Sequence, residues 1–164
     1  MRIGAFEVAD DLPTLREPRA IAMLRPWIDA GSVGALALAE VERQYGSERI
    51  ASLAKPDAFY DYTRYRPTVY IKDGRRSLSV PNTAVSVARP PSGPDLILIK
   101  MLEPHMFAGQ FIESVLRLMA NLGVRRYHWL GSMYDMVPHT MPLLISGGAI
   151  GLEAERDVRA LGIL

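Results

Sequence analysis

Residues 20–45 read AIAMLRPWIDAGSVGALALAEVERQY, and this stretch decides the fold. The apolar run 20–27 predicts a strand, with Pro26 near its end, where a missing N–H is tolerated. The turn Gly31-Ser32-Val33-Gly34 then leads into an amphipathic helix that Gly46 ends. One apolar stripe of that helix is predicted to face the core, made of Val33, Leu36, Ala37 and Val41. A strand, a tight loop and a helix in this order are typical of an α/β domain.

The same alternation continues along the chain. Residues 96–102 are almost entirely apolar, which predicts a central strand that is covered on both faces. Asp73-Gly74 predicts a hairpin between 68–72 and 75–80, because both turn positions need a positive φ. Shorter apolar runs predict strands at 50–54, 84–88, 124–130 and 143–145. The chain is therefore expected to form a mixed β-sheet flanked by helices, a three-layer α/β fold.

Two further helices complete the predicted layers. Residues 107–122 place one apolar face inward, and Gly123 is the expected C-terminal stop. The members of that face are Phe111, Val115, Leu118 and Leu122. Residues 152–161 predict a short helix that Gly162 caps. Because the chain then stops on an apolar tripeptide directly after a helix, we expect the natural protein to continue beyond Leu164.

Composition limits the class of protein. With 164 residues, 49% of them apolar and 23% charged, the chain has the composition of one globular domain. We expect an irregular lead-in over 1–19 and a single domain over 20–164. The absence of cysteine excludes disulfides and thiolate chemistry. A formal charge of +1 gives no strong field toward nucleic acid or anionic membranes.

Targeting signals are not predicted. The N-terminus runs into Asp10-Asp11 rather than into a long apolar segment, so it does not resemble a signal peptide. No apolar run approaches the ~20 residues that a transmembrane helix needs. We therefore expect a cytoplasmic protein that contacts neither membrane nor nucleic acid.

Loops after the predicted strands carry the candidate ligand cleft, because the carboxyl ends of parallel strands meet at one edge of a sheet. The cleft candidates are Asp29, Gly31, Ser32, Gly34, Glu103, His105, Ser132, His139 and Thr140. The glycine-rich turn allows two interpretations. Ser32 is the N-cap of a plain helix start, or the turn binds an anion through its backbone N–H groups.

Catalysis and metal binding have weaker support in the sequence. Ser132 and His139 could form a nucleophile and base, with Asp29 or Asp135 orienting the imidazole, but Gly131-Ser132-Met133 lacks the G-x-S-x-G pattern. A histidine that orders a loop between two prolines is the simpler interpretation. Glu103 and His105 alone do not make a metal site. We predict no catalytic residue, no metal and no cofactor.

The candidate interface is the polar aromatic run Tyr60-Asp61-Tyr62-Thr63-Arg64-Tyr65-Arg66. Tyrosine and arginine are enriched at interface hot spots, so Tyr60, Tyr62, Arg64 and Tyr65 are the predicted contacts. The same run could lie on its own domain with its rings inward. It could also stack on single-stranded nucleic acid, although three lysines in the whole chain supply little electrostatic affinity.

The order of several motifs resembles the proteasome assembly chaperone 2 family. The likeness starts in residues 27–37 and runs through Phe59-Tyr60-Asp61-Tyr62 and Arg66-Pro67. It continues at Pro94-Asp95, Glu103-Pro104, Leu122-Gly123-Val124, Leu130-Gly131 and Pro138-His139-Thr140. The resemblance covers most of residues 20–162 and implies a purine nucleoside phosphorylase-like α/β fold.

The resemblance also implies a function. Family members bind proteins, so the expected role is a non-enzymatic, self-associating module with assembly-chaperone character and proteasome-related partners. Some archaeal members end in a hydrophobic-Tyr-X tail that docks on proteasome α-rings, whereas this chain ends in Gly162-Ile163-Leu164. The alternative is a nucleoside-binding or phosphate-binding protein, or an enzyme, that uses the cleft at the strand ends.

Overall fold

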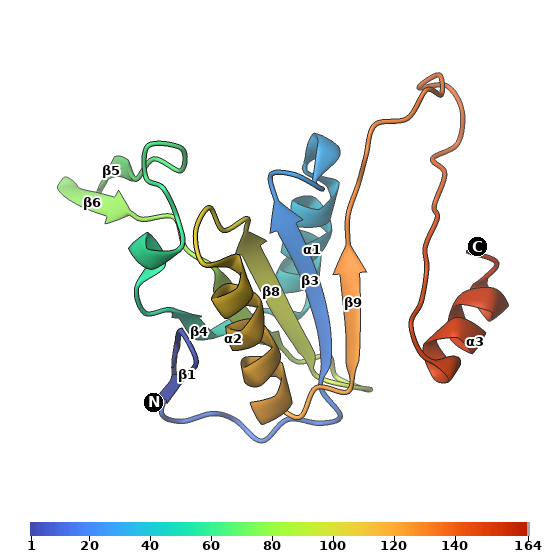
Figure 1. The fold of residues 1–164 in the computed structure, drawn as a ribbon, viewed down its shortest axis with the longest axis horizontal. Helices are drawn as coiled ribbons and strands as arrows, with labels where there is room; N and C mark the ends of the chain where they lie inside the picture. The colour runs from blue at the N-terminus through green and yellow to red at the C-terminus, as the bar shows by residue number, and fades with distance from the viewer. Residues whose placement is uncertain (164) are drawn as a thin grey trace. The chain divides into compact units, whose positions relative to one another are not determined.

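The computed structural model describes residues 1–163 as a mixed α/β protein. Seven strands form the main sheet in the order β1-β2-β4-β7-β8-β3-β9 (Figure 1). They are β1 (Arg2–Ile3), β2 (Phe6–Val8), β3 (Arg19–Arg25), β4 (Glu48–Leu53), β7 (Ala84–Ala88), β8 (Leu96–Leu102) and β9 (Arg126–Leu130). Strand β3 runs parallel to both β8 and β9, and the other neighbours in the sheet pair antiparallel. The predicted mixed sheet is confirmed.

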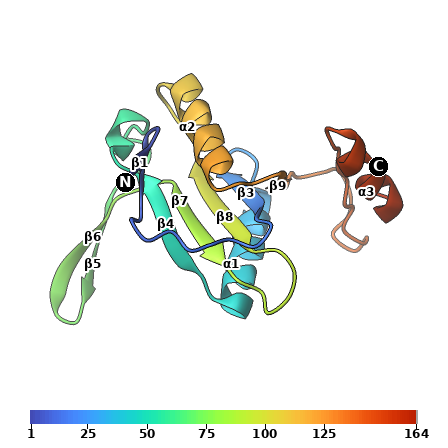
Figure 2. The ribbon, with the colours of Figure 1, turned by 90° about the horizontal axis from the view of Figure 1, so that it is seen from below.

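Two helices cover opposite faces of this sheet (Figures 1 and 2). On the face of α2 (Ala108–Asn121), the buried residues Phe111 and Leu118 belong to the same cluster as Ile97 and Ile99 of β8. On the other face, Leu38 of α1 (Val33–Tyr45) packs with Leu98 and Met23. Alternate residues of β8 thus enter different clusters, as expected of a strand that is covered on both faces.

The inward face of α1 differs from the prediction. Gly34 and Leu38 are its buried residues, whereas Val33 and Leu36 are 54% and 63% exposed. Ala37 is exposed as well, and only Val41 of the predicted stripe packs against the core. The inward face of α1 therefore lies about one residue further along the helix than predicted, at Gly34 and Leu38 instead of Val33 and Ala37. Gly34 and Ala35 carry so little side chain that they place this side of α1 against the sheet without contributing an apolar signal.

The N-terminal segment also differs from the prediction. Residues 2–8, expected to be irregular, form β1 and β2, and β2 pairs with β4. The turn between them places Gly4 at φ 57° against α2, where an added Cβ would lie 2.9 Å from Ser114 Cβ. Glycine is needed there both for the positive φ and for the close approach. Ser114 Oγ also accepts a hydrogen bond from the Ala5 N–H at 3.1 Å.

Strands β5 (Thr68–Lys72) and β6 (Arg75–Ser79) form the predicted hairpin as a separate two-stranded sheet. Asp73 and Gly74 have φ 51° and 74°, as the turn requires. In Figures 1 and 2 the hairpin extends away from the seven-stranded sheet. Every residue of β5 is exposed, and so is every residue of β6 except the partly buried Ser77.

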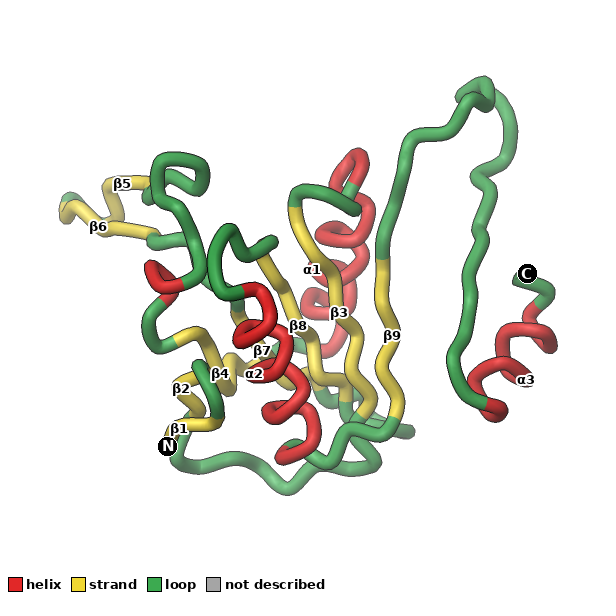
Figure 3. Tube along the Cα trace, viewed as in Figure 1, coloured by secondary structure: helices red, strands yellow, loops and turns green. Residues whose placement is uncertain are grey.

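The chain divides into two compact units, Met1–Met133 and Tyr134–Leu164. Within the described part of the second unit, the regular element is α3 (Leu152–Leu161) (Figure 3). The predicted strand at 143–145 is wrong, because these residues have no strand partner within residues 1–163 and a strand exists only through hydrogen bonds to a neighbour. Leu143, Leu144 and Ile145 are 93%, 78% and 74% exposed.

Within residues 1–163, no helix is long and apolar enough to cross a membrane.

Candidate functional site

A small cleft lies at the carboxyl ends of β3 and β8, the edge at which the sequence predicts ligand contacts. Its volume is about 240 Å³, and it is lined by Arg25, Pro26, Asp29, Ser32, Tyr65 and Leu102. The Arg25-Pro26 peptide bond, at the end of β3, is cis. Asp29 and Ser32 of the predicted cleft thus line a real cavity, whose volume is below the 300–1,000 Å³ typical of small-molecule sites.

Asp29 is the residue that caps α1. Its side chain is 9% exposed, and Oδ1 accepts hydrogen bonds from the Gly34 N–H at 2.7 Å and from the Ala35 N–H at 3.3 Å. Ser32 occupies the N-cap position at φ 59° without a side-chain cap bond, and Gly31 before it has φ 62°. The N–H groups that could bind an anion at this helix start therefore already donate hydrogen bonds to the carboxylate of Asp29.

A matched pair of variants tests whether Asp29 or Ser32 caps α1. We expect Asp29→Ala to lower the free energy of unfolding by about 1 kcal/mol, because two N–H groups at the start of α1 lose their acceptor. Ser32→Ala is expected to change it by less than about 0.5 kcal/mol. Urea denaturation followed by circular dichroism measures both. A larger loss for Ser32→Ala than for Asp29→Ala contradicts the assignment of the cap.

Ser132 meets the Asp29 loop directly. The two residues form a parallel β-bridge, with the Ser132 N–H donating to Ile28 O at 3.0 Å and the Ala30 N–H donating to Ser132 O at 3.1 Å. The Ser132 hydroxyl donates to Ala30 O at 2.8 Å. Gly131 permits this approach, because an added Cβ would lie 2.8 Å from Ile28 Cγ1. The hydroxyl is thus engaged by a backbone carbonyl.

The loop after β8 and the aromatic loop 59–65 are held together by several contacts. The His105 N–H donates to Phe59 O at 2.8 Å, and the Asp61 N–H donates to His105 Nδ1 at 3.1 Å. That bond makes Nδ1 the acceptor, so a neutral imidazole carries its proton on Nε2. The Tyr65 ring lies 4.6 Å from the imidazole between centroids, and its hydroxyl donates to Glu103 O at 3.2 Å. Partial burial and the Glu103 carboxylate both raise the pKa of Tyr65.

The structure sorts the four predicted interface residues. Tyr60 is 2% exposed, and its hydroxyl hydrogen-bonds Thr83 Oγ1 at 2.5 Å. Burial raises the pKa of Tyr60 strongly. The prediction that Tyr60 contacts a partner is therefore wrong, because a side chain buried in the core cannot reach one. Tyr62 and Tyr65 are partly buried against the core, whereas the side chain of Arg64 is 72% exposed.

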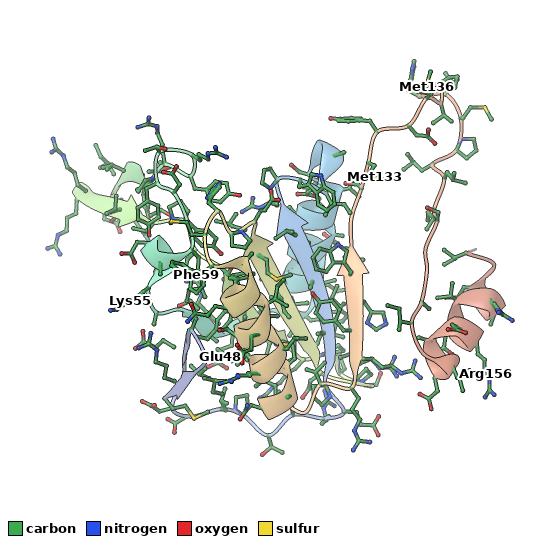
Figure 4. The ribbon with its side chains drawn as sticks, viewed as in Figure 1. Glu48, Lys55, Phe59, Met133, Met136 and Arg156 are labelled. Carbon is green, nitrogen blue, oxygen red and sulfur yellow. The ribbon has the colours of Figure 1, made fainter. Side chains whose placement is uncertain are left out.

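The buried side of this loop packs against α2. Phe59, labelled in Figure 4, lies beside the helix, with its ring 5.7 Å from the ring of Phe111. Tyr60 is 6.5 Å from the same ring. The predicted alternative, in which the aromatic loop lies on its own domain with its rings inward, thus describes these two residues. The exposed residues of the loop are Thr63 and Arg64, and Asp61, Tyr62 and Tyr65 are partly exposed.

His139 and Thr140 belong to the second unit, so their place in the cleft stays a prediction. The loop between Pro138 and Pro142 forms a turn, in which the Met141 N–H donates to Pro138 O at 2.9 Å. Among residues 1–163, no group of three or more histidine, aspartate or glutamate side chains could hold a metal ion.

Exposed apolar residues on the β5–β6 hairpin are a candidate binding surface that the sequence did not predict. Val69, Ile71 and Leu78 are 62%, 75% and 61% exposed. The Asp73-Gly74 turn predicted the hairpin but gave no sign that both of its faces lie away from the core. A usable signal was the pairing of TVYIK with the charged RRSLS, because a buried hairpin rarely carries three basic residues next to its turn.

The comparisons with known proteins agree on one family. The PAC2 family model matches residues 23–160. A PAC2 family protein from Streptomyces avermitilis is 27% identical with a TM-score of 0.73, over 89% of this chain and 72% of that one. A Mycobacterium tuberculosis proteasome-assembly chaperone homologue is 30% identical with a TM-score of 0.76, over 87% and 60%. No curated protein matches the chain.

A more distant structure shares the fold. PbaB of Pyrococcus furiosus, an archaeal proteasome activator, is 20% identical with a TM-score of 0.57, over 79% of this chain and 51% of that one. The chain thus spans less than two thirds of the length of the mycobacterial and archaeal proteins. Since the family model covers most of the sequence, the chain belongs to the PAC2 family.

Proposed function

We propose that this chain binds other proteins in an assembly-chaperone-like role and associates with itself, without bond-making chemistry in its cleft. The observation that carries the proposal is the exposed β5–β6 hairpin. Val69 pairs with Leu78 and Ile71 pairs with Arg76, so the three exposed apolar side chains share one face. A two-stranded hairpin is marginally stable alone, and exposed apolar patches of this kind mark interaction sites.

The hairpin also carries charge that favours one kind of partner. Lys72, Arg75 and Arg76 surround Asp73 at the turn, which leaves the tip positive. Arg64, in the loop that leads into β5, adds an exposed guanidinium, and Tyr62 and Tyr65 add the edges of two rings. These groups fit a partner that offers an apolar groove with an acidic rim.

The cleft supports binding over catalysis. The Asp29 carboxylate caps α1, the Ser132 hydroxyl donates to a backbone carbonyl, and His105 Nδ1 accepts a backbone N–H. These three polar groups, which could act on a substrate, thus already order loops. The same bonds hold the loops around the cleft in fixed positions, as a recognition surface needs. The proposal does not include a nucleoside site here, because Asp29 occupies the anion position.

Relatives suggest the partners. The mycobacterial relative is named a proteasome-assembly chaperone homologue. We propose proteasome-related proteins and a second copy of this chain as the partners of this surface. Proteasome α subunits are therefore the first protein to test, and light scattering tests self-association.

We expect Ile71→Ser, on the β5–β6 hairpin, to lower the affinity of the chain for its protein partners. Burying a side chain that is 75% exposed is worth roughly 1–2 kcal/mol, so binding should weaken about tenfold. The measurements are interferometry against purified proteasome α subunits and molar mass by light scattering. Leu36→Ser is the matched control, because Leu36 is 63% exposed on α1. A wild-type chain that stays monomeric and ignores the α subunits contradicts the proposal, and so does an Ile71→Ser variant that binds normally.

A further inference from the structure

The β5–β6 hairpin has two open edges. Within residues 1–163 its strands pair only with each other, and in Figure 2 both extend away from the seven-stranded sheet. An open edge presents N–H and C=O groups without strand partners, which a further strand can bind. Each edge of the hairpin is therefore a candidate site for a strand of another molecule.

The two edges differ in charge and in strand propensity. Strand β5 reads TVYIK, with β-branched and aromatic residues before a single lysine, whereas β6 reads RRSLS. Charged residues on an edge oppose its pairing with another strand. If β6 paired antiparallel with β6 of a second copy around Ser77, the two Arg76 residues would be diagonal neighbours roughly 7–8 Å apart. The β5 edge avoids this repulsion, so it is the edge suited to pairing with itself.

The register of the hairpin determines which backbone groups of β5 point outward. Lys72 and Arg75 flank the two-residue turn, and in such a hairpin the flanking pair exchanges both of its hydrogen bonds. Because bonding alternates along an antiparallel ladder, Val69 and Ile71 direct their N–H and C=O groups to the open edge. These two residues lie symmetrically about Tyr70. The edge of β5 is therefore complementary to a second copy of itself.

We propose that β5 pairs antiparallel with β5 of a second copy, about a two-fold axis at Tyr70. Val69 then lies opposite Ile71 of the second copy, and every residue of β5 has an opposite. Leu78 lies beside Val69 in the hairpin, so the apolar side chains of both copies adjoin on one face of a four-stranded sheet. Such a sheet is more stable than an isolated two-stranded hairpin. The two Lys72 side chains lie at opposite ends of the paired strands, which keeps the positive tips apart.

This inference rests on the self-association proposed above and specifies the surface that carries it. The edge of β5 forms the contact between the copies, whereas Val69, Ile71 and Leu78 keep their exposed side chains on the face of the sheet. One hairpin can thus join two copies and present a larger apolar face to a different protein.

Disulfide trapping tests the pairing, because the chain contains no cysteine of its own. At the two-fold axis, residue 70 of each copy forms a pair without mutual hydrogen bonds, the kind in which Cβ atoms lie closest, at about 4.5 Å. Under mild oxidation, Tyr70→Cys is expected to form a covalent dimer at least about tenfold faster than Ser77→Cys, as read on a non-reducing gel. Ser77→Cys is the matched control, because Ser77 lies opposite Tyr70 on β6. A mixture of Val69→Cys and Ile71→Cys is expected to cross-link faster than either variant alone.

Light scattering of the wild type separates failure of this inference from failure of the proposed function. A dimeric wild type in which Tyr70→Cys and Ser77→Cys cross-link equally fast overturns the β5 pairing and leaves self-association in place. Faster cross-linking of Ser77→Cys places the contact on β6, which also overturns the pairing. A monomeric wild type contradicts both proposals. Fast cross-linking of Tyr70→Cys, with a wild type that ignores proteasome α subunits, supports the pairing and contradicts only the proposed second partner.

Discussion

Phe111→Ala is expected to lower the free energy of unfolding by about 3–5 kcal/mol, the range for deleting a buried aromatic side chain. Phe111 is 3% exposed at the point where α2 meets the aromatic loop. The substitution leaves a cavity in the larger hydrophobic cluster and removes edge-to-face contacts with Phe59 and Tyr60. The loop that lines one side of the cleft therefore loses its main support.

Ile112→Ala is the matched control for this variant. Ile112 is the next residue of the same helix and is 57% exposed, so we expect a change below about 0.5 kcal/mol. Urea denaturation of both variants, with the slope of the transition held fixed, measures the difference. Equal losses in the two variants would show that the inward face of α2 is assigned incorrectly.

The inward face of α2 is the feature that the sequence predicted most accurately. The spacing of Phe111, Val115, Leu118 and Leu122 predicted a helix over 107–122, and all four residues are buried. The predicted strands 84–88 and 96–102 match β7 and β8 residue for residue. Long apolar periodicity is a property of the segment itself, so it is readable without knowledge of the partner.

Features that depend on contacts between distant segments of the chain were harder to predict. Residues 2–8 form a short segment that contains Gly4, and both the pairing of β2 with β4 and the close approach of Gly4 to Ser114 involve distant parts of the sequence. The run Leu143-Leu144-Ile145 has the composition of a strand but pairs with no strand in the described part of the chain. On α1, the small residue Gly34 faces the sheet and the large Leu36 faces outward, which reverses the hydrophobic signal.

The sequence predicted at which edge of the sheet the candidate cleft lies, but it did not predict which hydrogen bonds its residues make. Parallel strands bring loop ends to one edge, and this rule placed Asp29 near Ser132 and Glu103 near the end of β3. Which oxygen caps α1 depends on the φ values of Gly31 and Ser32, which the sequence does not reveal. The burial of Tyr60 depends on Thr83, which lies on a distant segment.

Asp95→Asn has the second largest expected effect, a loss of about 2–3 kcal/mol in the free energy of unfolding at neutral pH. Asp95 is 1% exposed, and its carboxylate accepts the Arg16 N–H at 2.9 Å and the Arg16 guanidinium at 2.8 and 3.1 Å. An amide at this position keeps one acceptor oxygen and points its NH2 group at the donors that face the other oxygen. The loss is smaller than for a fully buried ion pair, because the Arg16 side chain is 49% exposed and can be hydrated.

The same contact makes stability depend on pH in a defined direction. Burial alone would raise the pKa of Asp95, but the hydrogen bonds and the charge of Arg16 outweigh it and hold the pKa below the ordinary value of 3.8. The folded state therefore binds this proton less readily than the unfolded state. The stabilisation is complete above the unfolded pKa and is lost as pH falls through the lower folded pKa.

Denaturation measured from neutral pH down into the acid range distinguishes this carboxylate from others. Wild type is expected to lose stability as pH falls below about 5, and Asp95→Asn to show a shallower loss over the same interval, because its amide does not titrate. Asp57→Asn is the control, since Asp57 is exposed just before the aromatic loop and its variant should keep the wild-type slope. Parallel curves for wild type and Asp95→Asn would mean that another acidic group dominates acid unfolding. The Asp95–Arg16 pair would then only fix residues 16–19 at the start of β3, with no part in the pH response.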